Sequence, residues 1–268
     1  DYRSRGGKLT ISDWRRKNVD DFVERVYKGI KTEKPWVKFG ISPFGIYRPG
    51  IPAGITAGVD QYEDLAADCL KWFREGWCDY FTPQLYWPIE QEKQSFPVLL
   101  NYWREQNPKG RHLWPGLFTS QVDPGGAKWQ PSQVLRQIEL TRKNHPGVAG
   151  HVHFSFKALQ RNWAGIFGEL KSSTYPVPAI MPASPWLSQA VVPAPKLSAS
   201  SGRKVAWTEN RGDRFYAVQA LDSSGKWRLI QYSDRAEVVA PVGTTEIAVT
   251  TVNRFGTASK SARIAVKD

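Results

Sequence analysis

Four helical segments alternate with four short apolar segments over residues 12–156, and this alternation constrains the fold more than any other feature. The first helix is expected over residues 12–34, where apolar residues from Val19 to Ile30 recur at intervals of three and four. Ser12 is its expected N-cap. Strands separated by helices of this length are typical of parallel βα units. The sequence therefore predicts a parallel α/β sheet.

The other elements follow the same order along the chain. Asp60 and Glu63 form a capping-box pattern at the start of the second helix. The remaining helices are expected over 60–76, 96–106 and 131–143, and the strands over 37–42, 79–87, 112–118 and 147–156.

Four βα units make half of an eight-stranded barrel. A complete barrel needs roughly 250 residues, more than residues 1–174 provide. Half a barrel also leaves two edge strands with uncovered apolar faces. We therefore predict the C-terminal half of a (β/α)₈ TIM-type barrel, with the N-terminal half preceding it in the parent chain or supplied by another chain.

The pattern changes after Leu170. Six prolines between residues 175 and 196 predict a stiff linker that lies on the barrel surface. Beyond it, apolar residues alternate with period two, which predicts a small antiparallel sandwich. The expected strands cover residues 204–209, 214–222, 227–233, 245–253 and 262–268. The predicted domains are a partial barrel over 1–174, a linker over 175–195 and a β-sandwich over 196–268.

Composition excludes several classes of function. The net charge is +12, but Lys and Arg are scattered among Asp and Glu, so we expect no nucleic-acid partner and only a general attraction to polyanionic surfaces such as a cell envelope. We also expect no transmembrane segment, because no run of eighteen apolar residues occurs. Cys69 and Cys78 lack zinc-site spacing and are expected to be buried thiols.

In such barrels, function gathers where the strands end and in the loops that follow. Aromatic rings, amides and a guanidinium in one cleft suit a polyhydroxylated ligand. The candidate substrate-binding residues are Arg15, Arg16, Ser42, Phe44, Tyr47, Arg48, Gln84, Tyr86, Trp87, Trp114 and His153, with Phe118 and Ser155 beside them.

Structural alternatives exist for several of these residues. Ser42 and Phe44 could shape a tight turn, one of Arg15 and Arg16 could serve in a salt bridge, and Trp87 could close the core. Gln84 is the strongest functional candidate, since it ends an apolar run.

His151 and His153, two apart in one strand, could ligate a metal. No carboxylate lies beside them in the sequence, so we predict no metal and no cofactor.

The acids needed for glycoside hydrolysis are not evident. That reaction usually takes two carboxylates, yet no Asp or Glu ends a predicted strand. Asp79 begins a strand and is expected to be structural; Asp60, Glu90 and Asp123 lie in loops on the functional side. The catalytic residues therefore stay unassigned.

Several segments in order resemble the bacterial glycosyl-hydrolase-like family 10 proteins. The segments are DWRRKNVDDFVERVYKGIK, WVKFGISPFGIYRP, DYFTPQLYW, GVAGHVHFSF and YPVPAIMPASPWL, and the resemblance covers roughly residues 10–187. It implies a (β/α)₈ barrel, often followed by a fibronectin type III-like domain, in a cell-envelope or exported protein. The positions that match as cleft-forming residues are Trp14, Arg15, Arg16, Ser42, Pro43, Phe44, Arg48, Gln84, Tyr86 and Trp87.

The resemblance also implies hydrolysis of glycan chains, with peptidoglycan strands as substrate. The family's acidic segment at the fourth strand has no counterpart here. We therefore predict an extracytoplasmic glycoside hydrolase (periplasmic, lipoprotein or secreted) whose N-terminal half-barrel supplies the acids. The alternatives are a non-catalytic glycan-binding envelope protein and a metal-dependent hydrolase built on His151 and His153.

Overall fold

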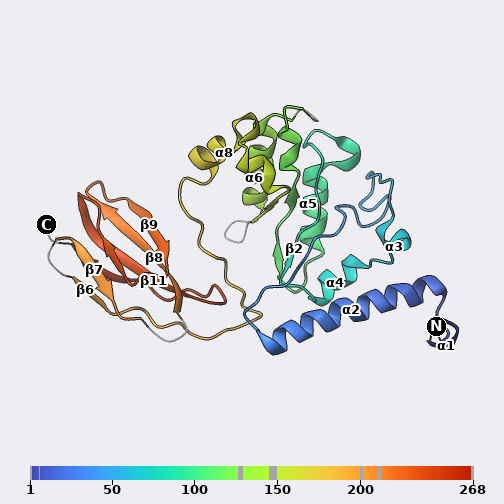
Figure 1. The fold of residues 1–268 in the computed structure, drawn as a ribbon, viewed down its shortest axis with the longest axis horizontal. Helices are drawn as coiled ribbons and strands as arrows, with labels where there is room; N and C mark the ends of the chain where they lie inside the picture. Colours follow the sequence, from blue (N-terminus) through green and yellow to red (C-terminus); the bar gives the residue numbers. More distant parts are fainter. Residues whose placement is uncertain are drawn as a thin grey trace. The chain divides into compact units, whose positions relative to one another are not determined.

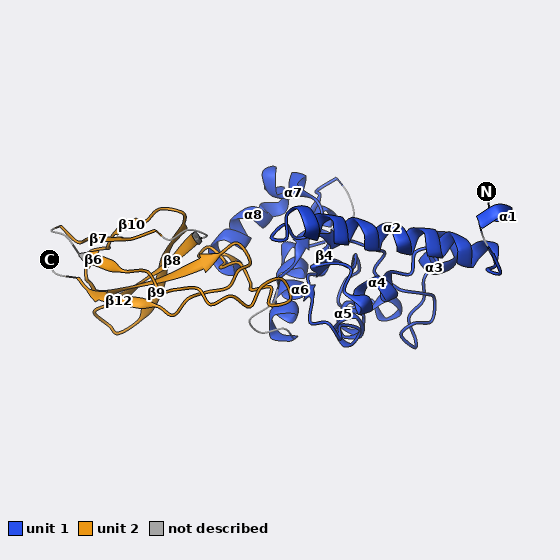
Figure 2. Cartoon of the chain, turned by 90° about the horizontal axis from the view of Figure 1, so that it is seen from below, with its two compact units in different colours: residues 1–174 blue, residues 175–268 orange. Residues whose placement is uncertain are grey.

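The chain divides into two compact units, which are described separately. The computed structural model describes residues 2–5, 7–125, 129–144, 150–199, 202–209 and 213–266. Unit 1 covers Asp1–Thr174 and unit 2 covers Tyr175–Asp268 (Figure 2).

Unit 1 mixes helices with short strands (Figure 1). Its longer helices are α2 (Ile11–Glu33), α4 (Cys69–Glu75), α5 (Phe96–Glu105) and α6 (Pro131–Asn144). Its shorter helical segments are α1 (Tyr2–Arg5), α3 (Gln61–Asp64), η1 (Glu92–Gln94), η2 (Thr119–Val122), α7 (Phe156–Gln160), η3 (Trp163–Gly165), α8 (Ile166–Glu169) and η4 (Leu170–Thr174). Its strands are β1 (Gly40–Ile41), β2 (Tyr80–Phe81), β3 (His112–Leu113), β4 (Gly116–Leu117) and β5 (Val152–His153).

The first predicted helix is confirmed as α2, with one correction at its start. The N-cap is Thr10 rather than Ser12, because the Thr10 hydroxyl accepts the backbone N–H of Asp13 at 3.1 Å. On the expected apolar face Val23 is buried, whereas Phe22 is 57% exposed. Within unit 1, α2 therefore buries only part of its apolar surface.

The second predicted helix, over 60–76, is two helices in the structure. Asp60 caps α3 as expected, but the backbone N–H of Asp60 donates to Asp64 rather than to Glu63. The chain then breaks at Ala66, whose φ is 53°. Asp68 starts α4 by accepting the N–H of Lys71 at 3.2 Å. A second strong N-cap residue within the segment thus favours two short helices over one long helix.

The strands of unit 1 pair in parallel, as the alternating pattern predicts. β1 pairs with β2, β2 with β3, and β4 with β5. A further parallel bridge joins Gln84 to Gly116, which links the two groups. The regular pairing is shorter than expected, because Pro43, Pro83 and Pro115 interrupt the segments and have no backbone N–H to donate. Residues 147–149 of the fourth expected strand lie outside the described residues.

The sheet has two different faces, because successive strand residues point to opposite sides. We call the first the helix face, defined by Phe81, Leu85, Leu113 and Leu117, all buried. Phe81 shows why: its ring stacks on Phe73 of α4 at 4.3 Å and lies 4.9 Å from Trp103 of α5.

We call the second the open face. It is defined by Tyr80, Gln84, Tyr86, Val152 and Phe154, none of which is buried. Val152 and Phe154 are 41% and 50% exposed.

Unit 2 consists of two antiparallel sheets. Their strands are β6 (Leu197–Ala199), β7 (Lys204–Trp207), β8 (Asp213–Asp222), β9 (Trp227–Ser233), β10 (Glu237–Val239), β11 (Thr244–Asn253) and β12 (Ala262–Ala265). Strand order is β10-β7-β6 in one sheet and β12-β11-β8-β9 in the other. Trp207, Tyr216, Val218, Ile247 and Val249 belong to their shared core. The five expected strands are present, while β6 and β10 are too short to give a period-two signal.

The proline-rich segment belongs to unit 2 and is hydrogen-bonded to other residues of that unit. Ser184 donates its backbone N–H to the carbonyl of Phe255 at 2.8 Å, and Met181 donates to the hydroxyl of Tyr232 at 3.3 Å. These bonds tie residues 181–184 to the β-sheet domain. These contacts lie within unit 2, and the position of the linker on the barrel surface stays a prediction.

Two further expectations concern cysteines and membrane segments. Cys69 and Cys78 are buried and unbridged, as expected. Among the described residues, no helix is long and apolar enough to cross a membrane.

Candidate functional site

The ends of the parallel strands bring an amide and several aromatic rings to the open face. Phe44 follows β1, and Gln84 follows β2; the two are bridge partners. The Gln84 side-chain amide donates to the carbonyl of Ser42 at 3.1 Å, so the turn after β1 fixes its position. We call this set the strand-end group; it comprises Phe44, Gln84, Tyr86, Trp87, Phe118 and Phe154.

Ring contacts hold the strand-end group together in two clusters. Phe44 meets Trp87 edge to face, with ring centroids 5.6 Å apart. Tyr86 lies 4.8 Å from Phe118 and 5.6 Å from Phe154, and the last two lie 5.5 Å apart. Such offset and tilted arrangements are the favourable geometries for aromatic pairs. Side chains that follow β1, β2, β4 and β5 therefore form two aromatic clusters.

Two glycines allow these close approaches. A Cβ at Gly116 would lie 3.2 Å from the ring of Tyr86, and one at Gly45 would lie 2.2 Å from the carbonyl oxygen of Gln84. A side chain at Gly45 would therefore displace the Gln84 backbone, while one at Gly116 would crowd the Tyr86 ring. Both glycines help to set the position of the strand-end group.

Phe154 is a member of this group that the sequence analysis missed. Its backbone N–H donates to Leu117 at 2.8 Å, and its carbonyl accepts the N–H of Ser120 at 2.9 Å. The period-two rule would have placed it on the face opposite to His153. The sequence analysis selected His153 and Ser155 on either side of Phe154 but not Phe154 itself.

His153, expected in the cleft, lies on the helix face instead. It is in register with the buried Leu117, and its Nδ1 lies 2.7 Å from the hydroxyl of Thr119. Burial lowers the pKa of His153 to about 4 and that of His151 to about 3. The two rings lie 5.2 Å apart on the same face, away from the strand-end group.

Trp114 occupies a different level of the sheet. Its ring stacks on Tyr80 at 4.8 Å and on His112 at 5.0 Å. A Cβ at Gly150 would lie 2.5 Å from it, so the glycine makes room for the indole. Trp114 therefore packs against Tyr80 and His112 on the sheet. Among the described ring contacts, none joins it to the strand-end group.

The predicted arginines belong to a separate ionic network. Arg16 donates to Asp13 at 2.8 Å and to Glu63 at 3.0 Å, while Arg48 donates to Asp60 at 3.0 Å. The hydrogen bond to Asp13 raises the pKa of Arg16.

Tyr62 lies between the two guanidinium groups, 4.1 Å from Arg16 and 4.5 Å from Arg48. Tyr47 borders the network, 6.0 Å from Tyr62 by ring centroid, and donates to Asp68 at 3.2 Å. Arg15 is exposed on α2. Arg16 and Arg48 thus form salt bridges with acids of this chain. The alternative that one of Arg15 and Arg16 serves in a salt bridge fits Arg16.

The loop acids have partners of their own. Glu90 accepts from Arg136 at 2.6 Å, and Asp123 accepts the N–H of Gly125 at 2.9 Å. A backbone hydrogen bond, followed by Arg136, lowers the pKa of Glu90. A general acid in glycoside hydrolysis needs the opposite shift. Asp60 is bound to Arg48, as described.

Asp79 has the structural role expected for it. Its buried carboxylate accepts from the hydroxyl of Tyr27 at 3.2 Å and from the N–H of Phe39 at 2.7 Å, and it pairs with Lys31. Asp79 thus fixes α2 to the start of β1. Within the described residues, no cluster of three His, Cys, Asp or Glu side chains could hold a metal ion.

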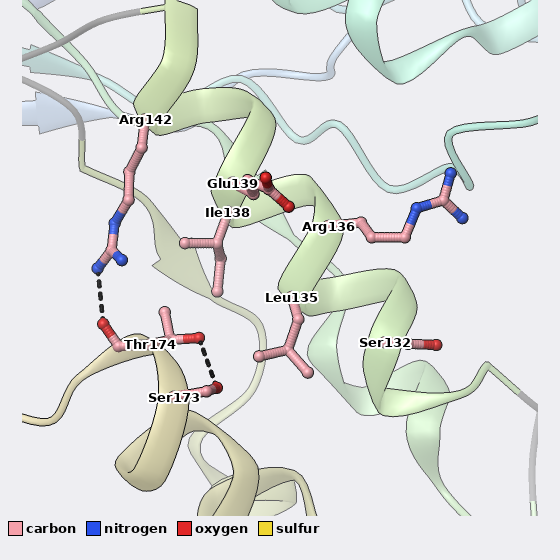
Figure 3. Close-up of a pocket in the computed structure, with 8 residues that line it drawn as sticks. All are labelled: Ser132, Leu135, Arg136, Ile138, Glu139, Arg142, Ser173 and Thr174. Atoms are coloured by element: carbon pink, nitrogen blue, oxygen red, sulfur yellow. Dashed lines mark hydrogen bonds between the residues drawn. The ribbon is translucent and has the colours of Figure 1, made fainter.

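A groove of about 370 Å³ lies elsewhere in unit 1, between α6 and η4 (Figure 3). Leu135 and Ile138 supply its apolar lining, and Arg142 bonds the carbonyl of Thr174 at 3.0 Å across it. This groove belongs to the helical layer, so it is separate from the strand-end group.

Known proteins similar to this chain are described as glycosyl hydrolases or glycosyl hydrolase-like. The model of the family "Glycosyl hydrolase-like 10" matches residues 4–134. Glycosyl hydrolase YngK of Bacillus subtilis (strain 168) is 40% identical over 195 residues, which cover 70% of this chain and 38% of YngK. Glycosyl hydrolase DigH of Escherichia coli (strain K12) is 37% identical over 126 residues, which cover 45% of this chain and 29% of DigH.

The chain therefore spans well under half the length of these curated relatives. A solved structure, the glycoside hydrolase domain of Spr0440, Endo-D, from Streptococcus pneumoniae R6, is 19% identical and covers 30% of this chain and 16% of its own. Its TM-score of 0.25 is too low to define the fold.

Proposed function

We propose that this chain, which belongs to the glycosyl hydrolase-like 10 family through residues 4–134, supplies the sugar-binding half of a glycoside hydrolase acting on bacterial cell-wall glycans. The observation that carries the proposal is the strand-end group. It combines aromatic rings with the Gln84 amide where parallel strands end, the place where barrel enzymes bind their substrates. The proposed substrate is the glycan strand of peptidoglycan.

For the fold, we propose that unit 1 is the C-terminal half of a (β/α)₈ barrel. Its parallel βα units and the exposed Val152 on the open face support this, since a closed barrel would cover that residue. Phe22 on α2 is a further exposed apolar residue that a preceding helix would cover. For unit 2, the two antiparallel sheets of three and four strands support a fibronectin type III-like domain.

We propose that the two half-barrels also divide the catalytic and sugar-binding roles. Asp60 and Glu90 are bound to arginines, and Asp123 is bound to backbone. We therefore place the catalytic carboxylates in the N-terminal half-barrel, with this chain positioning the sugar.

The test is glycan release from purified peptidoglycan by the full-length protein. Gln84→Ala should lower the release rate about fivefold to tenfold, because one hydrogen bond to a sugar hydroxyl is lost. Gln160→Ala, an exposed glutamine on α7, is the matched control and should leave the rate unchanged. Absence of any release by the unmutated protein would contradict the hydrolase assignment.

A second candidate is a non-catalytic glycan-binding envelope protein. The partners of the three loop acids favour it, because they leave no carboxylate among these in a catalytic setting. Retention of cell-wall glycan without bond cleavage, together with weaker retention by Gln84→Ala, would select this alternative.

We also propose an extracytoplasmic location, in the periplasm, on a lipoprotein anchor or secreted. The net charge of +12 supports it, since envelope polymers are often polyanionic. Fractionation of cells expressing the full-length protein tests it; recovery with the cytoplasm alone would contradict it.

A further inference from the structure

We infer that Phe154 forms, with Tyr86 and Phe118, a neutral aromatic platform on which a glycan chain of several sugars lies across the strand ends. This inference rests on the proposed function and deepens it. It adds Phe154 as a binding residue, an orientation of the glycan chain across the strand ends, and the uncharged character of the contact.

The position of Phe154 is the first observation. It lies just beyond Val152–His153, the last paired residues of β5, and so belongs to the loop region where barrel ligands bind. Its side chain is 50% exposed. A ring of this size that is half exposed yet packed on two other rings presents a flat apolar surface.

The second observation is that the platform is rigid. Hydrogen bonds to Leu117 and from Ser120 hold the backbone of Phe154 on both sides. The hydroxyls of Ser120 and Ser155 lie 3.0 Å apart, and Ser155 donates its N–H to Ser120 at 2.9 Å. The ring is therefore in place before a ligand arrives, which reduces the entropy lost on binding.

The third observation is the extent of the aromatic surface. The pair Phe44–Trp87 stands at the ends of β1 and β2, whereas Phe154 stands at the end of β5. β3 and β4 are consecutive parts of one extended segment and count as one strand here. Three interstrand spacings therefore separate β1 from β5, a distance of about 14 Å. This length exceeds one sugar ring, so a ligand that contacts both aromatic clusters is a chain rather than a monosaccharide.

The fourth observation is the lack of charge. Burial raises the pKa of Tyr86, and the three rings of the platform carry no charge. The two arginines predicted to line the site, Arg16 and Arg48, are bound to acids in their own network. Contact on the platform is therefore made by apolar sugar faces, while the Gln84 amide is the polar group beside it.

The experiment measures the affinity of the full-length protein for oligosaccharides of β-1,4-linked N-acetylglucosamine with one, two and four units. These probes are neutral and share a linked amino-sugar backbone with cell-wall glycans. We expect affinity to rise with chain length. Phe154→Leu keeps apolar volume but removes the ring, and should lower affinity for the four-unit chain about fivefold to tenfold. Phe154→Trp keeps an aromatic ring and should bind the four-unit chain about as well as the unmutated protein.

Phe167→Leu is the matched control, because Phe167 on α8 is also 50% exposed. It should leave every affinity unchanged. Salt provides the second arm: binding should differ little between low salt and about 0.5 M salt, since screening acts on charges.

Three outcomes would overturn the inference: equal affinity for all chain lengths, equal affinities of Phe154→Leu and Phe167→Leu, or a steep loss of binding with salt. If Phe154→Leu lowers stability but not affinity, the preceding half-barrel covers this ring and the platform does not bind sugar. In each case, glycan release that still depends on Gln84 would leave the proposed function standing. Failure of the unmutated protein to bind or release any glycan would instead remove both.

Discussion

The two faces of the parallel sheet differ more than their sequences suggest. On the helix face, Phe81, Leu85 and Leu117 are fully buried among helices. On the open face, Gln84, Tyr86 and Phe154 are not buried, and the rings of Tyr86 and Phe154 stack at the strand ends. Adjacent residues such as Gln84 and Leu85 therefore serve different purposes. The helix face holds the unit together, while the open face is the surface that we propose binds a ligand.

The helix face should respond most strongly to mutation. Phe81→Ala removes a ring packed between Phe73 and Trp103, and should lower the free energy of unfolding of unit 1 by about 3–5 kcal/mol. Denaturant unfolding followed by tryptophan fluorescence measures it. Phe154→Leu on the open face, by contrast, should cost less than about 1 kcal/mol. Similar losses at the two positions would remove the distinction between the faces.

The histidines of the helix face predict a smaller, pH-dependent effect. Burial lowers the pKa of His153 to about 4, whereas an unfolded histidine titrates near 6.5. The unfolded chain thus binds the proton first, so stability is full above about pH 6.5 and falls as the pH decreases toward 4.

Between pH 7 and pH 5 this histidine should account for a loss on the order of 2 kcal/mol. His153→Gln removes that titration, so its free energy of unfolding should change correspondingly less over the same interval. Guanidinium unfolding of both proteins at the two pH values measures the difference. An unchanged pH dependence in His153→Gln would show that the ring is not buried in its neutral form.

Much of the fold was predictable because periodicity reports burial. The interval of three and four identified α2, and alternation identified the long strands β8 and β11. The break between α3 and α4 was not, because it depends on the competing cap at Asp68. The short strands β6 and β10 were missed because three residues are too few to show a period.

The candidate site was harder to predict, because residue type alone does not tell what a side chain contacts. Arg16 and Gln84 were both selected as polar residues, yet Arg16 is bound to Asp13 and Glu63 while the Gln84 amide is bound to the carbonyl of Ser42. Phe154 was missed, although Phe118, whose ring it contacts, was selected. Strand register would have identified it, since register assigns His153 and Phe154 to opposite faces.

The smallest expected effect tests whether the open face is covered in the full-length protein. Val152 is 41% exposed here, so Val152→Thr should change the free energy of unfolding of this chain by no more than about 0.5 kcal/mol. If a preceding half-barrel closes over the open face, the same hydroxyl is buried there, and the cost should rise to about 1–3 kcal/mol. Chemical denaturation of both proteins compares the two values, with Val191→Thr as control because Val191 is 93% exposed. An equally small cost in the full-length protein would mean that Val152 stays exposed to water. The proposal that a preceding half-barrel covers the open face would then be contradicted.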